Sequence, residues 1–254
     1  MALDAVGWTG LTFKALKMEP DFVLITLSFA FTWLFYTKDR LEISTVDSEN
    51  NPNRTRWYAS QKHLKKLMLL ASFLIFGCLL MRLPLLLPAF IGIVPCLFYT
   101  KTWTFRHQTY SLKGLPGMKV ILVSFLWVLL TIGFPLSTLP TNLPPIAAIL
   151  DLSLMVGFFI MLQIHTNDLR DIEGDVKAHI HSFAVLLGDK KARLLGLLFI
   201  GVGIYFGWGL FNHAALLLFG FILALRTLFY KKEYDIYWQI IISLQGVFAY
   251  FILG

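Results

Sequence analysis

The sequence predicts an all-α polytopic membrane protein, a single domain over residues 1–254. Its 254 residues are 57% hydrophobic with a mean hydropathy of +0.70, and only 15% are charged, against about a quarter in soluble domains. Several apolar runs approach the roughly 20 residues that cross a bilayer core, and they do not alternate in polarity as barrel strands would. We expect a bundle of about nine transmembrane helices, eight clear and the first short, around an apolar cavity.

The segments follow one another with breakers at several joints. The first, over 3–17, is weak because Asp4 and Lys14 interrupt its apolar stretch. A tight turn is predicted at "MRLP" (81–84), and "STLPTNLPP" (137–145) and "GWGLFNH" (207–213) separate two further pairs. The other predicted spans are about 21–37, 66–81, 83–100, 119–138, 146–164, 194–210, 213–230 and 236–253.

The positive charge is concentrated on one predicted side of the membrane. Together with the basic residues at their margins, the loops at 38–65, 101–118, 165–193 and 230–235 hold 19 of the 22 Lys and Arg residues. The positive-inside rule makes this side cytoplasmic. The net charge of +7 is therefore mainly a topology signal that also suits anionic membrane lipid, and no nucleic-acid partner is expected.

The most informative motif is "NDLRDIEGDVKAHIHSFAVLLG", which runs from residue 167 to 188 directly after a predicted span. Asp168, Asp171 and Asp175 follow a D-x-x-D-x-x-x-D pattern and would share one face if the preceding helix continued. Three carboxylates on one face repel each other unless a cation neutralises them. Mg²⁺ takes such oxygen ligands and bridges them to substrate phosphates.

The same spacing fits a solvated helix end. In that interpretation Arg170 and Lys177 simply pair with the acids, and the spacing alone leaves both interpretations open. Glu173 falls off the shared face and is expected to be solvated.

A second acidic cluster lies in the first loop, "KDRLEISTVDSENNPNRTRWY" (38–58). It places Asp39, Glu42 and Asp47 on the same predicted side of the membrane, and its "NNPNR" turn carries Arg54. Two acidic clusters at the same helix ends could meet across a bundle and enclose a metal–diphosphate group, whose remaining charge Arg and Lys would neutralise.

These motifs resemble those of the UbiA superfamily of intramembrane prenyltransferases. Residues 167–188 are similar to the second aspartate-rich motif of that family and the helix start after it. "D-x-x-N-x-P-x-R" over 47–54 resembles the end of its first motif, and "YSLKGLPGMK" (110–119) resembles its middle cytoplasmic loop. With the helix count, the resemblance covers nearly the whole chain.

The first motif departs from the family pattern N-x-x-x-D-x-x-x-D. Counting back from Asp47, the earlier positions are Ile43 and Asp39, so the middle carboxylate is absent and Glu42 stands one residue away. Either Glu42 replaces that acid or the metal site is altered.

The resemblance implies Mg²⁺-dependent transfer of an isoprenyl group from its diphosphate to an aromatic or other lipophilic acceptor. The implied catalytic metal ligands are Asp39, Asp47, Asp168, Asp171 and Asp175. The implied substrate-binding residues are Glu42, Asn50, Arg54, Lys101, Lys119, Asn167, Arg170 and Lys177. Lys119 also fits a second interpretation, as the boundary residue of its helix.

Two other functions remain open at this point. A membrane terpene cyclase would use the same diphosphate chemistry but end in intramolecular cyclisation, and the altered first motif leaves room for it. A cation-dependent transporter is disfavoured, because transporters place ionisable groups near the midplane in broken helices. The acceptor, the prenyl length and the oligomeric state are not predicted.

Overall fold

The computed structural model describes residues 1–41, 56, 60–61, 63–99, 102–105, 108–112, 115–139, 143–177, 180–229 and 244–253, without the side chains of 39–40, 96–97 and 102–111. The helices are α1 (Ala2–Ala15), α2 (Phe22–Leu41), α5 (Leu64–Met81), η1 (Leu83–Leu85), α6 (Leu86–Tyr99), α7 (Met118–Val128), η3 (Leu129–Gly133), α8 (Phe134–Ser137), α9 (Ile146–Arg170), α10 (Ile172–Lys177), α11 (Phe183–Gly207), α12 (His213–Phe229) and α14 (Gln245–Leu253). Two strands, β1 (Thr102–Phe105) and β2 (Gln108–Ser111), complete the described elements.

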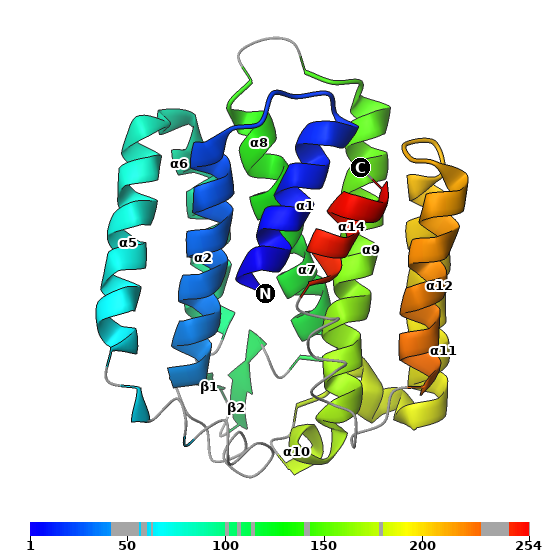
Figure 1. Ribbon diagram of the computed structural model, residues 1–254. Coiled ribbons are helices and arrows are strands. Elements are labelled where there is room, and N and C mark those ends of the chain that lie inside the picture. The colour runs from blue at the N-terminus through cyan, green and yellow to red at the C-terminus, as the bar shows by residue number, and fades with distance from the viewer. Residues whose placement is uncertain are drawn as a thin grey trace.

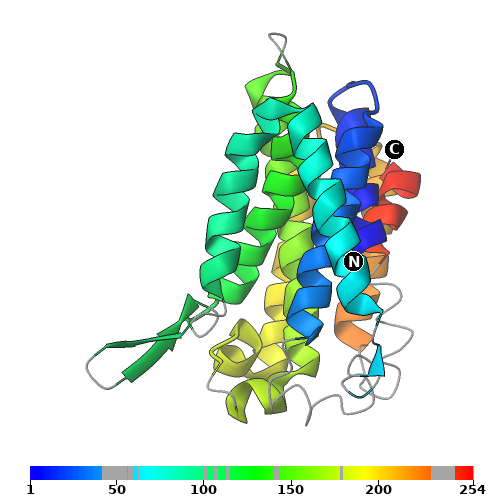
Figure 2. The same cartoon turned by 90° about the vertical axis from the view of Figure 1, so that its left-hand side faces the viewer.

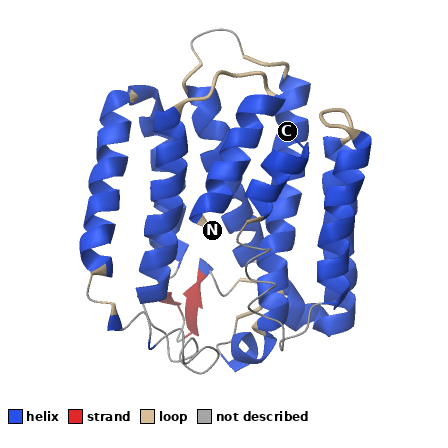
Figure 3. Ribbon diagram, in the orientation of Figure 1, coloured by secondary structure: helices blue, strands red, loops and turns tan. Residues whose placement is uncertain are grey.

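The long helices stand side by side and form a bundle (Figures 1 and 3). Its outer faces expose large apolar side chains such as Phe73, Phe90 and Phe221, which suits a lipid environment. Among the described residues, three helical stretches are long and apolar enough to cross a membrane: Leu64–Met81, Met118–Ser137 and Ile146–Arg170. Other apolar helices are shorter, so the count of nine spans stays a prediction.

Most observed helices begin and end within a few residues of the predicted spans. The clearest differences flank the second acidic loop, where α9 continues to Arg170 and α11 begins at Phe183 rather than near 194. Gly188 kinks α11 with φ 73° and ψ 163°. The charged stretch "DKKAR" (189–193) follows that kink, so hydropathy registers only the apolar part of α11.

The connection after α6 contains a hairpin that the sequence analysis treated as loop. β1 and β2 pair antiparallel with Trp103 opposite Tyr110, and the hairpin projects away from the helices (Figure 2). Threonines alternate with aromatic residues along "TWTF", as in a strand, but four residues are too few for the pattern to be distinctive.

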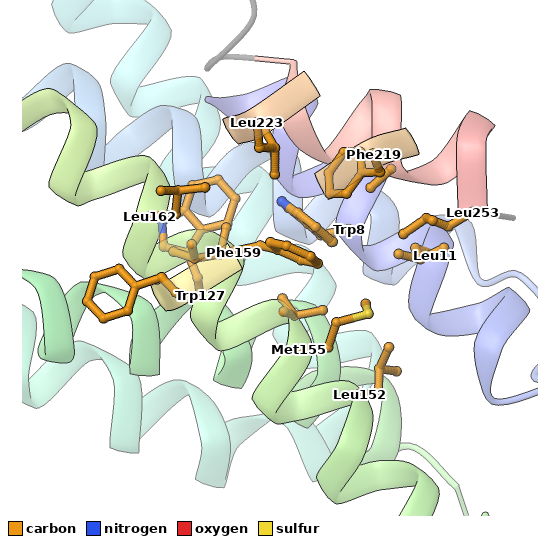
Figure 4. Packing of buried hydrophobic residues seen from close by; sticks show 14 of the residues in the cluster. Trp8, Leu11, Trp127, Leu152, Met155, Phe159, Leu162, Phe219, Leu223 and Leu253 are labelled. Atoms are coloured by element: carbon orange, nitrogen blue, oxygen red, sulfur yellow. The ribbon is translucent and has the colours of Figure 1, made fainter. Parts of the chain in front are cut away.

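The largest core cluster joins the first helix to α9 and α12. Trp8 stacks on Phe159 at a centroid distance of 6.3 Å, and Phe159 meets Phe219 edge-on at 5.1 Å (Figure 4). All three side chains are buried. These aromatic contacts add to burial by roughly 0.5–1.5 kcal/mol per pair.

The same region contains a buried polar cluster, which we define as Asp4, Gln163, Arg226 and Gln245. The Asp4 carboxylate accepts hydrogen bonds from Gln163 Nε2 at 2.7 Å and from the Gly246 N–H. Arg226 Nη1 donates to Gln245 Oε1 at 3.4 Å. Because lipid offers no alternative partners, these bonds hold α1, α9, α12 and α14 together.

Helices α1 and α14 approach each other closely at a pair of glycines. A Cβ built on Gly7 would lie 2.2 Å from the carbonyl carbon of Gly246, so no larger residue fits there without a shift. The first and last described helices are therefore in backbone contact, as small residues permit between apolar helices.

Candidate functional site

The site lies at the end of the bundle where α2 and α9 finish and α10 is found (Figure 1). The ends of α2 and α9 lie at this same end, as the positions of the two acidic loops predicted. The membrane side that it faces stays a prediction.

Helix α9 ends just as the aspartate motif begins. Asp168 lies in its last turn, and Asp171 follows it with φ −96° and ψ 11°, outside helical geometry. Helix α10 then starts at Ile172 and carries Asp175. The chain therefore bends between Asp168 and Asp175. No continuous helix gives the three aspartates one shared face.

Asp168 forms a buried ion pair with a residue from a different helix. Its Oδ1 lies 2.5 Å from Nζ of Lys119, near the start of α7. The Asp168 side chain is fully buried and that of Lys119 is 20% exposed. The pairing places the Lys119 ammonium beside Asp168, while its part in substrate binding stays a prediction.

Asp175 lies close to this pair and is itself 5% exposed. Burial raises the pKa of its carboxyl above the ordinary value, against the lowering effect of the Lys119 charge, and the Asp168 carboxylate raises it further. The Ser182 hydroxyl hydrogen-bonds to this carboxylate. Oδ2 of Asp175 is buried and finds no hydrogen-bond donor among the described residues.

Asp171 is engaged by its neighbour in sequence. Arg170 donates from Nε to Oδ1 at 2.7 Å and from Nη2 to Oδ2 at 2.6 Å, a bidentate arrangement. Glu173 and Lys177 are exposed on α10, which agrees with the expectation for Glu173. Asn167 is partly buried, and its carbonyl oxygen accepts from the Asp171 N–H at 3.1 Å.

Several predicted site residues cannot be placed. Asp39 belongs to the last turn of α2, but its side chain is not described. The others lie outside the described residues: Glu42, Asp47, Asn50, Arg54 and Lys101.

Mg²⁺ fits the chemistry of the donors that are described. A hard cation takes carboxylate oxygens, and the buried, unpartnered Oδ2 of Asp175 is such an oxygen. Across the described ranges, no three His, Cys, Asp or Glu side chains come close enough to hold a metal ion by themselves. A complete metal site would therefore need ligands from elsewhere, such as the predicted Asp47, or from a substrate.

Two sets of residues escaped the sequence analysis. The first is Gly117 with residues 181–183, which link α7 to α10 and α11. A signal was available in "GLPGMK", where glycine directly precedes a helix as its N-cap. The second is the buried polar cluster. Asp4 and Arg226 stand inside apolar helical patterns, and such placement is itself a signal.

Comparison with known proteins gives two matches. A family model described as the UbiA prenyltransferase family matches residues 44–240. Among solved structures, the chain is similar to the apo structure of a UbiA homolog from Aeropyrum pernix K1, with a TM-score of 0.67 and 12% identity over 99% of this chain and 93% of that one. At this identity the likeness concerns the fold. No curated protein sequence matches.

Proposed function

We propose, from the premise that this chain belongs to the UbiA prenyltransferase family, that it transfers an isoprenyl group from an isoprenyl diphosphate to a lipophilic acceptor within the membrane. An aromatic acceptor is the first candidate. The proposal includes dependence on Mg²⁺ and a cytoplasmic orientation for the end of the bundle that carries α10, as the distribution of basic residues suggests.

The observation that carries this proposal is the buried group formed by Lys119, Asp168 and Asp175. Buried charges are costly in an apolar bundle, and paired groups of both signs at its rim are the kind needed to bind a metal–diphosphate. Bound Mg²⁺ would neutralise diphosphate oxygens as a Lewis acid. The Asp175 carboxylate offers an oxygen ligand, and the Lys119 ammonium can donate hydrogen bonds to phosphate oxygens.

The bundle contributes by excluding water. Loss of diphosphate leaves an allylic cation, which water would capture before the acceptor could attack. Behind the site, the interior-facing residues of α9, such as Phe159 and Met155, are buried and apolar. An apolar interior of this kind would keep water away from such a cation.

The test measures diphosphate release by the full chain in detergent, with Mg²⁺ and allylic diphosphates of graded length, with and without lipophilic acceptors. We expect the parent protein to release diphosphate and Asp175→Asn to lose activity by on the order of a hundredfold. Glu173→Gln is the matched control, because Glu173 is an exposed carboxylate on the same short helix; it should retain activity.

Two outcomes would redirect the proposal. No release under any condition, with Asp171→Ala indistinguishable from the parent, would remove isoprenyl-diphosphate chemistry altogether. Release without acceptor, together with a cyclic hydrocarbon product, would replace the transferase with a membrane terpene cyclase.

A further inference from the structure

Residues 181–183 contact both Gly117, two residues before Lys119, and the Asp175 carboxylate. The backbone carbonyl oxygen of His181 accepts a hydrogen bond from the Gly117 N–H at 3.1 Å. The hydroxyl of Ser182 hydrogen-bonds to the Asp175 carboxylate and also accepts from a backbone N–H as the N-cap of α11. This short segment therefore connects the chain that leads to Lys119 with the helix that carries Asp175.

The third residue of the segment, Phe183, lies directly against Gly117. A Cβ built on Gly117 would lie 2.3 Å from Cζ of the Phe183 ring and 2.6 Å from its Cε1. Gly117 also has φ 66° and ψ −6°, a left-handed conformation that glycine adopts without strain. The ring thus covers the glycine at the point where the chain turns into α7.

The direction of the chain at Gly117 determines where Lys119 lies. Gly117 is the N-cap of α7, and Lys119 is two residues further on, within the first turn. A change in the backbone at the N-cap would tilt that turn and move the Lys119 ammonium from its position 2.5 Å from Asp168. We call the contact of Gly117 with residues 181–183 the clasp.

We propose that Phe183 is a positioning residue for diphosphate binding, because its ring holds the clasp closed and so keeps Lys119 beside Asp168 and Asp175. The substrate does not need to touch Phe183. This inference rests on the proposed function, in which Lys119 binds the diphosphate. It adds a specific claim: the affinity for the diphosphate depends on a packing contact outside the charged group.

A purely structural role predicts something different. Phe183 would then contribute stability by burying its ring, and the folded fraction of a variant would bind diphosphate normally. Phe206 provides a matched control, since it is in the same helix and stacks on Phe158 at a centroid distance of 6.4 Å, away from the clasp.

The kinetic test compares Phe183→Ala with Phe206→Ala at a temperature where both variants are folded. We expect Phe183→Ala to raise the KM for the allylic diphosphate about tenfold or more, without a change in the acceptor KM, because misplacement of a binding group weakens its own ligand. Phe183→Met, which keeps most of the volume, should recover most of the affinity. Phe206→Ala should change neither KM.

A double variant tests whether the effect passes through Lys119. If it does, Phe183→Ala adds no further rise in KM to Lys119→Met, since the positioned group is already absent. If the two substitutions instead raise the KM for the diphosphate by independent factors that multiply, the positioning role is overturned.

A second measurement does not depend on activity. Lys119 is labelled with an amine-reactive reagent in the full chain, and its modification rate is followed by mass spectrometry. The paired ammonium should react slowly in the parent and in Phe206→Ala, and faster in Phe183→Ala. Equal rates in all three proteins overturn the inference. A different outcome separates this inference from the proposed function. If Phe183→Ala is labelled faster but the parent protein releases no diphosphate from any substrate, the proposed function and the role in diphosphate binding are refuted. The claim that Phe183 positions Lys119 would still hold.

Discussion

Replacing Lys119 with methionine tests the electrostatic basis of the site most directly. Methionine keeps the length and apolar contacts of the side chain but removes the ammonium. Asp168, which is fully buried, would then lose the cation that lies 2.5 Å from its Oδ1. The loss of a counter-charge at this distance is strongly unfavourable for a buried carboxylate.

The expected cost follows from the burial of the two partners. Removing one partner of a buried ion pair lowers the free energy of unfolding by about 3–5 kcal/mol. Because Lys119 is 20% exposed, water screens part of the interaction, and we expect a value near the lower end, about 3 kcal/mol. The double variant Lys119→Met/Asp168→Leu removes both charges and should return to within about 1 kcal/mol of the parent.

The assay is equilibrium unfolding in mixed detergent–SDS micelles, followed by tryptophan fluorescence. Lys177→Met is the control, because Lys177 is exposed on α10 and its loss should cost no more than about 0.5 kcal/mol. A Lys119→Met protein as stable as the parent, or a double variant less stable than the single one, would refute the view that Asp168 depends on Lys119.

Three further predictions concern the bundle and the metal. Gly7→Ala should lower the free energy of unfolding by about 1–3 kcal/mol, because its Cβ meets Gly246, whereas Gly77→Ala has open space and should be neutral in the same unfolding assay. Asp4→Ala should cost about 3–5 kcal/mol, because it leaves Gln163 Nε2 and the Gly246 N–H without their acceptor. Asp4→Asn, whose amide oxygen still accepts, should cost less, and equal unfolding midpoints for the two variants would contradict this. Chelation by EDTA should abolish diphosphate release and excess Mg²⁺ should restore it, so release that persists in EDTA would exclude the metal requirement.

The sequence predicted the helices because hydropathy is a local property. Runs such as 66–81 and 146–164 are predominantly apolar, and the structure has helices there. The common side of the bundle on which α2 and α9 end was also predictable, since it follows from counting spans. The break at Asp171 was not, because no residue at that bend is a strong helix breaker.

The contacts of the site needed the tertiary structure. The spacing of the aspartates suggested a cation but did not indicate which one lies closest, and Arg170 and Lys177 were the nearest in sequence. The structure pairs Asp168 with Lys119, from a helix nearly 50 residues earlier. That pairing depends on how α7 and α9 pack, which no local pattern encodes.

The bond between Asp4 and Gly246 has a consequence for biosynthesis. The two residues are 242 positions apart, so at typical synthesis rates the acceptor exists for roughly 10–50 s before its donor is made. During that interval the first helix has an acid inside the membrane without its final partners. A ribosome-bound or truncated intermediate should therefore hold α1 loosely, and arrival of α14 would complete the bundle.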